Sequence, residues 1–162
     1  MEKIYLKPES QEILIKGDAK EGHLDAFSYD PGNDENAKRL GSLFVVGHVH
    51  HLTDDLSYSV NLIAALAKRE YYATPGIAPR EAFSRTLKKV NEVVDDFFKH
   101  EGLAVNIGVF AIAGEQIFLS RLGKFKLLLA NPNNLCPIGM IYYKKLLQRK
   151  RRARTLSTPP LI

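Results

Sequence analysis

The chain has 162 residues, with 23 lysines and arginines against 18 aspartates and glutamates, and a formal net charge of +5. This length suits one domain with a hydrophobic core. A composition that is 45% hydrophobic and 25% charged excludes wholesale disorder and a membrane bundle. The single cysteine, Cys136, excludes an intrachain disulfide and suits a reducing compartment. No apolar run is long enough for a signal peptide or a membrane span, so we expect a cytoplasmic protein without a transmembrane segment.

The positive charge is concentrated near the C-terminus. Residues 144–154 include seven basic side chains and no acidic ones. Without those seven, 16 of the 23 basic residues remain against 18 acidic ones, so the rest of the chain carries −2. This tail is a solvated end, a contact for phosphate backbones or anionic surfaces, or a chain end unrelated to the domain. Because no aromatic residue lies within Arg149–Arg154, a specific nucleic-acid reader is not expected.

Hydrophobic patterning predicts strands, then two helices. The stretch Asp30–Asn33 is a strong turn signal, and residues 33–39 are expected to form a charged loop. Leu43–Val46 is a compact apolar run of strand length. Apolar residues then recur at helical spacing over 56–67, and a second helix is predicted from Pro79 to about His100.

Strands are predicted again in the second half of the chain, at Val105–Ala113, Gln116–Arg121 and Lys126–Ala130. Residues 1–130 are expected to form the domain, and residues 131–162 an irregular segment with the basic tail. This order predicts an α+β fold in which helices pack on an antiparallel or mixed sheet. Uncovered sheet edges favour self-association, so either a homo-oligomer, such as a dimer, or a marginally stable monomer is expected.

Three histidines, His48, His50 and His51, follow the predicted strand in a segment expected to be a loop. Alternate imidazoles can share a metal ion when carboxylates approach from elsewhere in the fold. Polar loop histidines without a ligand are the alternative interpretation. The segment Gly47–His50 is also similar to one motif of calcineurin-like metallophosphoesterases, although the Asp-x-His and Gly-Asn-His-Asp motifs of that family are absent. Asp25, at the start of a predicted strand, is either a divalent-cation ligand or a hydrogen-bonding turn residue.

From residue 13 to about 130, the order of elements resembles the PPM-type (PP2C-like) metal-dependent protein phosphatase domain. The segment Lys20–Phe27 is similar to an early family motif, in which Asp25 matches the family's Asp and Lys20 the phosphate-binding Arg. Leu43–His48 is similar to a strand that ends in Asp-Gly-His, and Arg121–Lys126 to a hairpin motif containing Gly-Asp-Ser-Arg. The resemblance implies a PPM-like α-β-β-α sandwich, with antiparallel sheets flanked by helices, that is truncated at its C-terminus. It also implies Mn²⁺ or Mg²⁺ as the cofactor if the chain is active.

The departures from the family pattern concern its metal ligands. Val46 or Gly47 occupies the place of the bridging Asp, and Lys124 that of the Asp in the hairpin motif. Two metal ions need several oxygen ligands, and only Asp25 is matched. His48 matches a histidine proposed as the general acid in the family, which makes it the candidate catalytic residue.

We therefore expect a degenerate domain that has lost protein Ser/Thr phosphatase activity. It would act as a pseudophosphatase or interaction module that binds a phosphorylated protein through Lys20 and the segment around His48. One alternative is a divergent metal-dependent phosphatase, with its metal held by Asp25, His48, His50 and His51. Another is a protein that binds nucleic acid or anionic surfaces through its basic tail.

Overall fold

The computed structural model describes residues 11, 13, 22–50, 58–101, 105–126, 128–131, 134–137 and 141–145. In chain order the elements are β1 (Gly22–Tyr29), α1 (Glu35–Leu40), β2 (Ser42–His50), α2 (Ser59–Tyr71), α3 (Pro79–Glu101), β3 (Val105–Ala113), β4 (Gln116–Leu122), β5 (Leu128–Asn131), β6 (Asn134–Pro137) and β7 (Ile141–Lys145).

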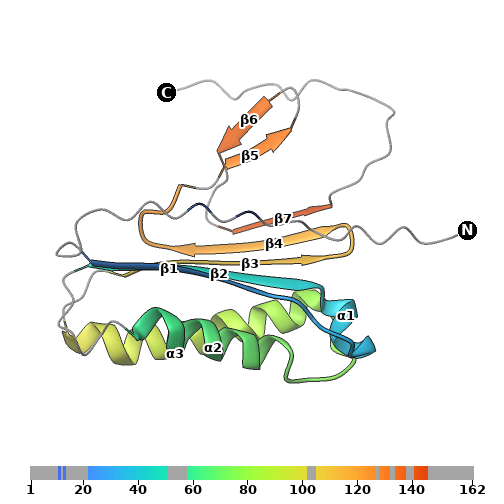
Figure 1. Cartoon of the computed structure of the whole chain (residues 1–162), viewed down its shortest axis with the longest axis horizontal. Coiled ribbons are helices and arrows are strands. Elements are labelled where there is room, and N and C mark those ends of the chain that lie inside the picture. The colour runs from blue at the N-terminus through green and yellow to red at the C-terminus, as the bar shows by residue number, and fades with distance from the viewer. Residues whose placement is uncertain are drawn as a thin grey trace, which may run out of the picture.

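Five of these strands form one antiparallel sheet in the order β1-β2-β3-β4-β7, while β5 pairs with β6 in a separate two-stranded sheet. Helices α2 and α3 lie along one side of the larger sheet, and the β5–β6 pair lies on the opposite side (Figure 1). The fold is therefore α+β, as the sequence predicted, with helices packed on an antiparallel sheet.

The side chains of strand β2 alternate between the two faces of the sheet. Leu43, Val45 and Val49 are completely buried, whereas Phe44, Val46 and His48 are half-buried. Successive side chains of a strand point to opposite faces, so the buried set lies under the helices. Gly47 belongs to this set, and a Cβ atom on it would lie only 2.4 Å from Cγ1 of Val60. The missing side chain thus allows α2 to approach β2 directly.

Two tyrosines at the end of α2 fix this helix to the start of β2. The Tyr71 hydroxyl donates a buried hydrogen bond to the Leu40 carbonyl at 2.7 Å, and the Tyr72 hydroxyl donates one to the Gly41 carbonyl at 2.7 Å. Burial raises the pKa of both phenols, so both remain protonated donors at neutral pH.

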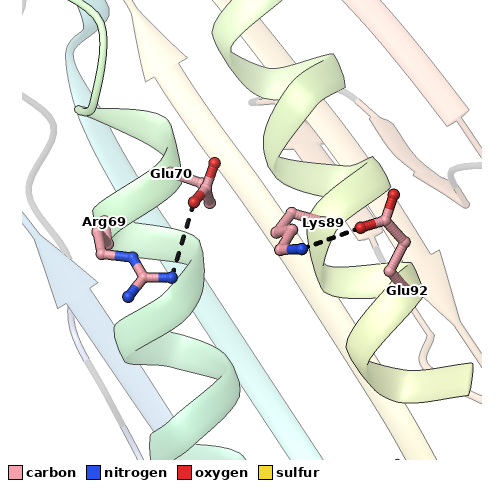
Figure 2. Close-up of polar contacts among 4 residues, drawn as sticks. All are labelled: Arg69, Glu70, Lys89 and Glu92. Carbon is pink, nitrogen blue, oxygen red and sulfur yellow. Dashed lines mark hydrogen bonds and ion pairs between the residues drawn. The ribbon is translucent and has the colours of Figure 1, made fainter. Parts of the chain in front are cut away.

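Helix α3 covers the other half of the sheet, and its solvent side is charged. The rings of Phe83 in α3 and Phe118 in β4 have centroids 5.7 Å apart. On the outer surface, Arg69 pairs with Glu70 at 3.8 Å and Lys89 with Glu92 at 3.1 Å (Figure 2). These pairs are partly solvent-exposed, and such pairs contribute about 1 kcal/mol or less to stability. The helices are therefore held mainly by their apolar faces.

The sequence predicted the two long helices well. Helix α3 begins at the predicted Pro79 and ends within about a residue of the expected position. The N-terminal part predicted for the first long helix lies outside the described residues, and α2 begins at Ser59. Residues 33–39 are not a charged loop, because α1 forms there. Its Ala37 and Leu40 lie one helical turn apart and are both buried, so tertiary packing outweighs the charged composition of the segment.

The segment 131–162 also differs from the prediction of irregular structure. It contains β6 and β7, and β7 pairs with β4 at the edge of the main sheet. The β-prone run Ile141-Tyr142-Tyr143 supplies most of β7, and an open edge beside β4 gives it hydrogen-bond partners. Residues 146–162, with most of the basic tail, lie outside the described residues.

We predict that Gly47→Ala destabilises the fold by about 1–3 kcal/mol, because the added methyl group would overpack the contact with Val60. Chemical denaturation followed by circular dichroism measures this change in unfolding free energy. Gly114→Asn is the control, since Gly114 has a φ of 57° that Asn tolerates, and nothing lies within 4 Å of its Cβ position. Equal stability of Gly47→Ala and the wild type would contradict the close packing of α2 on β2.

Candidate functional site: two faces of the β1–β2 strand pair

The histidine motif lies within strand β2 rather than in a loop. His48 is paired with Leu24 of β1 on one side and with Asn106 of β3 on the other. The prediction of a loop at this point was therefore wrong for His48 and His50. The physical reason is that backbone pairing on both sides continues the strand past Gly47 as far as Val49, and pairing with β1 extends it to His50.

His48 and His50 lie on the face of the sheet away from the helices, and their imidazoles contact each other. The ring centroids are 3.9 Å apart and the ring planes meet at 64°. Burial, followed by the neighbouring charge of His50, lowers the pKa of His48 below its ordinary value. The His48 imidazole is therefore mainly neutral at physiological pH, with a nitrogen lone pair available to accept a proton or a metal ion.

Asp25 lies on the opposite face of the sheet. It is directly across from Gly47, the glycine that contacts α2, and residues directly opposite in an antiparallel pair share a face. Its neighbours on β1 alternate to the other side, where Leu24 is across from His48. The structure therefore does not bring the Asp25 carboxylate together with the imidazoles of His48 and His50.

Local contacts explain what the Asp25 carboxylate does instead. Its Oδ1 accepts a hydrogen bond from the backbone N–H of Ala26 at 3.0 Å, and its Oδ2 lies 3.7 Å from Nε2 of His23. That nitrogen of His23 is shielded from solvent and has no hydrogen-bond partner among the described residues. Strand β1 is at one edge of the sheet among the described strands. The Asp25 carboxylate thus accepts a hydrogen bond from a backbone N–H group of an edge strand. A charge at such an edge also opposes pairing with another chain.

Asn106 connects the turn after β4 to the strand position next to His48. The sequence analysis did not assign Asn106 to a site. The side-chain oxygen of Asn106, the strand partner of His48, accepts a hydrogen bond from the backbone N–H of Lys124 at 2.7 Å. Gly123 has a φ of 81°, and a Cβ on it would lie 2.1 Å from the same oxygen. Only a glycine permits this close approach. The sequence does indicate a turn at Gly123-Lys124. Its contact with Asn106, 18 residues earlier in the chain, cannot be predicted from the spacing of the residues.

Aromatic side chains continue this helix-free face away from the histidines. The Phe44 and Phe110 rings have centroids 6.3 Å apart on neighbouring strands. Gly108 lies next to them, and its Cβ position is 3.8 Å from the Phe125 ring. These half-buried rings form an apolar surface beside the polar group made by His48 and Asn106.

The remaining predicted site residues, Lys20 and His51, lie outside the described residues. Within the described ranges, no three His, Cys, Asp or Glu side chains are grouped closely enough to hold one metal ion. A two-metal Mn²⁺ or Mg²⁺ centre needs several oxygen ligands, so the described donors do not fit it. In that same part of the chain, no helix combines the length and the apolar character needed to cross a membrane.

A cavity of about 280 Å³ lies on the helix side of the sheet, between α3 and strands β3 and β4. Its walls are mainly apolar and include Leu87, Val90, Val94, Ile107 and Leu122. None of the described residues that line it is a histidine or carries a carboxylate. The cavity is therefore separate from the candidate site on the other face.

Comparison of the chain with models of protein families, with curated proteins and with solved structures gives no match.

We expect Asp25→Ala to increase self-association, because the substitution frees the Ala26 N–H and removes a charge from the edge strand. Sedimentation velocity at several protein concentrations measures the effect as a rise in the dimer fraction. Asp96→Ala, which removes the same charge from an exposed position on α3, is the matched control. If the Asp25 and Asp96 variants sediment alike at every concentration, Asp25 does not protect the edge.

Proposed function

We propose that the chain is a PPM-like domain without phosphatase activity, and that it binds a phosphorylated protein at the helix-free face around His48. The element order supports the family resemblance. Strands β1 and β2 are followed by the helix pair α2–α3 and then by the β3–β4 hairpin, all in one antiparallel sheet with the helices on one side.

The observation that carries the loss of activity is that, in the described part of the chain, the residues paired with His48 bear no carboxylate. Its strand partners on this face are Leu24 and Asn106, and the turn beside Asn106 carries Lys124. Asp25 is across from Gly47 and already bonded to the Ala26 amide. Without several oxygen ligands, no pair of divalent ions is held to activate water or to neutralise a transferring phosphoryl group.

The same composition favours binding a phosphate group. Next to His48 on this face, His50 and Asn106 carry hydrogen-bonding side chains and Leu24 is apolar, while the nearby Lys124 is basic and solvent-exposed. A lysine ammonium is a common point-charge partner for phosphate, and neutral imidazole and amide groups supply further hydrogen bonds. Lys20, which matches the phosphate-binding Arg of the family, would add a second cation. The adjacent Phe44 and Phe110 rings offer apolar contacts to residues that flank a phosphorylated side chain.

We predict that the purified chain does not hydrolyse phosphoserine or phosphothreonine peptides in the presence of Mn²⁺ or Mg²⁺. The measurement is phosphate release over a range of metal concentrations, with Asp25→Ala assayed in parallel. Metal-dependent turnover that is lost in Asp25→Ala would overturn the proposal and favour a divergent phosphatase.

Binding is measured separately, by fluorescence anisotropy with a phosphoserine peptide library and its unphosphorylated counterpart. Lys124→Ala should weaken phosphopeptide binding by about two- to fivefold, the effect expected of one exposed charge. Lys88→Ala, which removes an exposed charge from α3, should leave binding unchanged. Equal affinity for phosphorylated and unphosphorylated peptides would contradict the phosphate-binding function.

A further inference from the structure

The contact between His48 and His50 has a chemical consequence that does not depend on phosphate binding. The two residues are separated by one position on β2, so their side chains project from the same face of the sheet. Their ring centroids are only 3.9 Å apart. Imidazoles at alternate positions on one face of a strand can each supply one nitrogen to the same ion.

Among the described residues, Gly22 leaves space beside the His48 ring. Gly22 is the strand partner of His50, and its Cβ position lies 3.2 Å from Nε2 of His48. Because Gly22 has no side chain, nothing at that position covers this nitrogen. Both histidines are partly exposed, so water can complete the coordination of a bound ion.

We propose that His48 and His50 together bind one divalent transition-metal ion of the class that prefers imidazole nitrogen, such as Ni²⁺, Cu²⁺ or Zn²⁺. Imidazole suits these ions, whereas Mg²⁺ and Mn²⁺ prefer carboxylate, carbonyl and water oxygens. The Asp25 carboxylate lies on the other face of the sheet and does not contribute. The Asn106 oxygen is bonded to the Lys124 amide and does not contribute either.

This assignment reverses the metal preference that the phosphatase resemblance implies. A carboxylate centre selects Mn²⁺ or Mg²⁺, but a pair of imidazoles selects ions toward the Cu²⁺ end of the divalent series. Two protein ligands also hold an ion less firmly than the three or four of catalytic and structural zinc sites. We therefore expect a site of one ion per chain that chelators empty readily.

Isothermal titration calorimetry of the full chain with NiCl₂, and separately with MnCl₂, tests the site. We expect one Ni²⁺ per chain and no measurable Mn²⁺ binding. His48→Gln and His50→Gln should each weaken Ni²⁺ binding by more than about tenfold, since each removes one of only two protein ligands. Both side chains are half-exposed on a strand, and thermal melts of each variant verify that it is folded.

His23→Gln is the matched control, because it removes an imidazole from the other face of the same strand pair. Its Ni²⁺ affinity should equal that of the wild type. The proposal is overturned if the double variant His48→Gln/His50→Gln still binds Ni²⁺ with wild-type affinity, or if Mn²⁺ binds as tightly as Ni²⁺. Since no phosphopeptide is present, these outcomes are independent of the proposed phosphate-binding function.

Discussion

The close contact between Gly47 and Val60 determines how chemical groups are distributed over this domain. A glycine at the centre of β2 lets α2 pack against the strand backbone, where any larger residue would meet a valine side chain. Leu43, Val45 and Val49 follow the same alternation and are buried beneath the helices. Once Gly47 faces α2, strand geometry requires His48 and His50 to project from the other side.

This arrangement divides the predicted metal site into two unconnected parts. On the helix side, Asp25 is engaged by the Ala26 amide and lies near His23, and these contacts give it a structural role at the sheet edge. On the helix-free side, His48 and His50 contact each other, with Asn106 and Lys124 nearby. The described groups there are imidazole, amide and ammonium groups. The phosphate-binding and metal-binding proposals both follow from this composition.

Sequence patterning predicted the parts of the fold in which one period extends over many residues. Helix α3 was predicted at both ends because its apolar positions recur along most of its length and Pro79 marks its start. Strands β3 and β4 were predicted from an apolar run interrupted by a Gly-Glu turn. The short helix α1 was not predicted, because its charged composition is typical of a loop and only two of its residues, Ala37 and Leu40, are apolar and buried.

The site was harder to predict because it depends on register rather than on composition. The candidate residues His48, His50 and Asp25 were identified from the sequence, but Gly47 suggested a strand end, and the histidines were therefore placed in a loop. In the structure, buried and half-buried residues alternate through Gly47 to Val49, as expected of a continuous strand. The face of the sheet on which Asp25 lies is set by its pairing with Gly47. This pairing joins two separate strands, and no local sequence pattern specifies it. The role of Asn106 depends on a long-range contact in the same way.

The central claim, that Asp25 and the two histidines occupy opposite faces, is tested most directly by nuclear Overhauser effects in the isotope-labelled chain. The account predicts strong effects between the Val60 methyl groups and the Gly47 Hα protons, and none between those methyl groups and the His48 ring. It also predicts effects between the His48 and His50 rings. Effects that join the His48 ring to the Val60 methyl groups or to the Asp25 Hβ protons would contradict it.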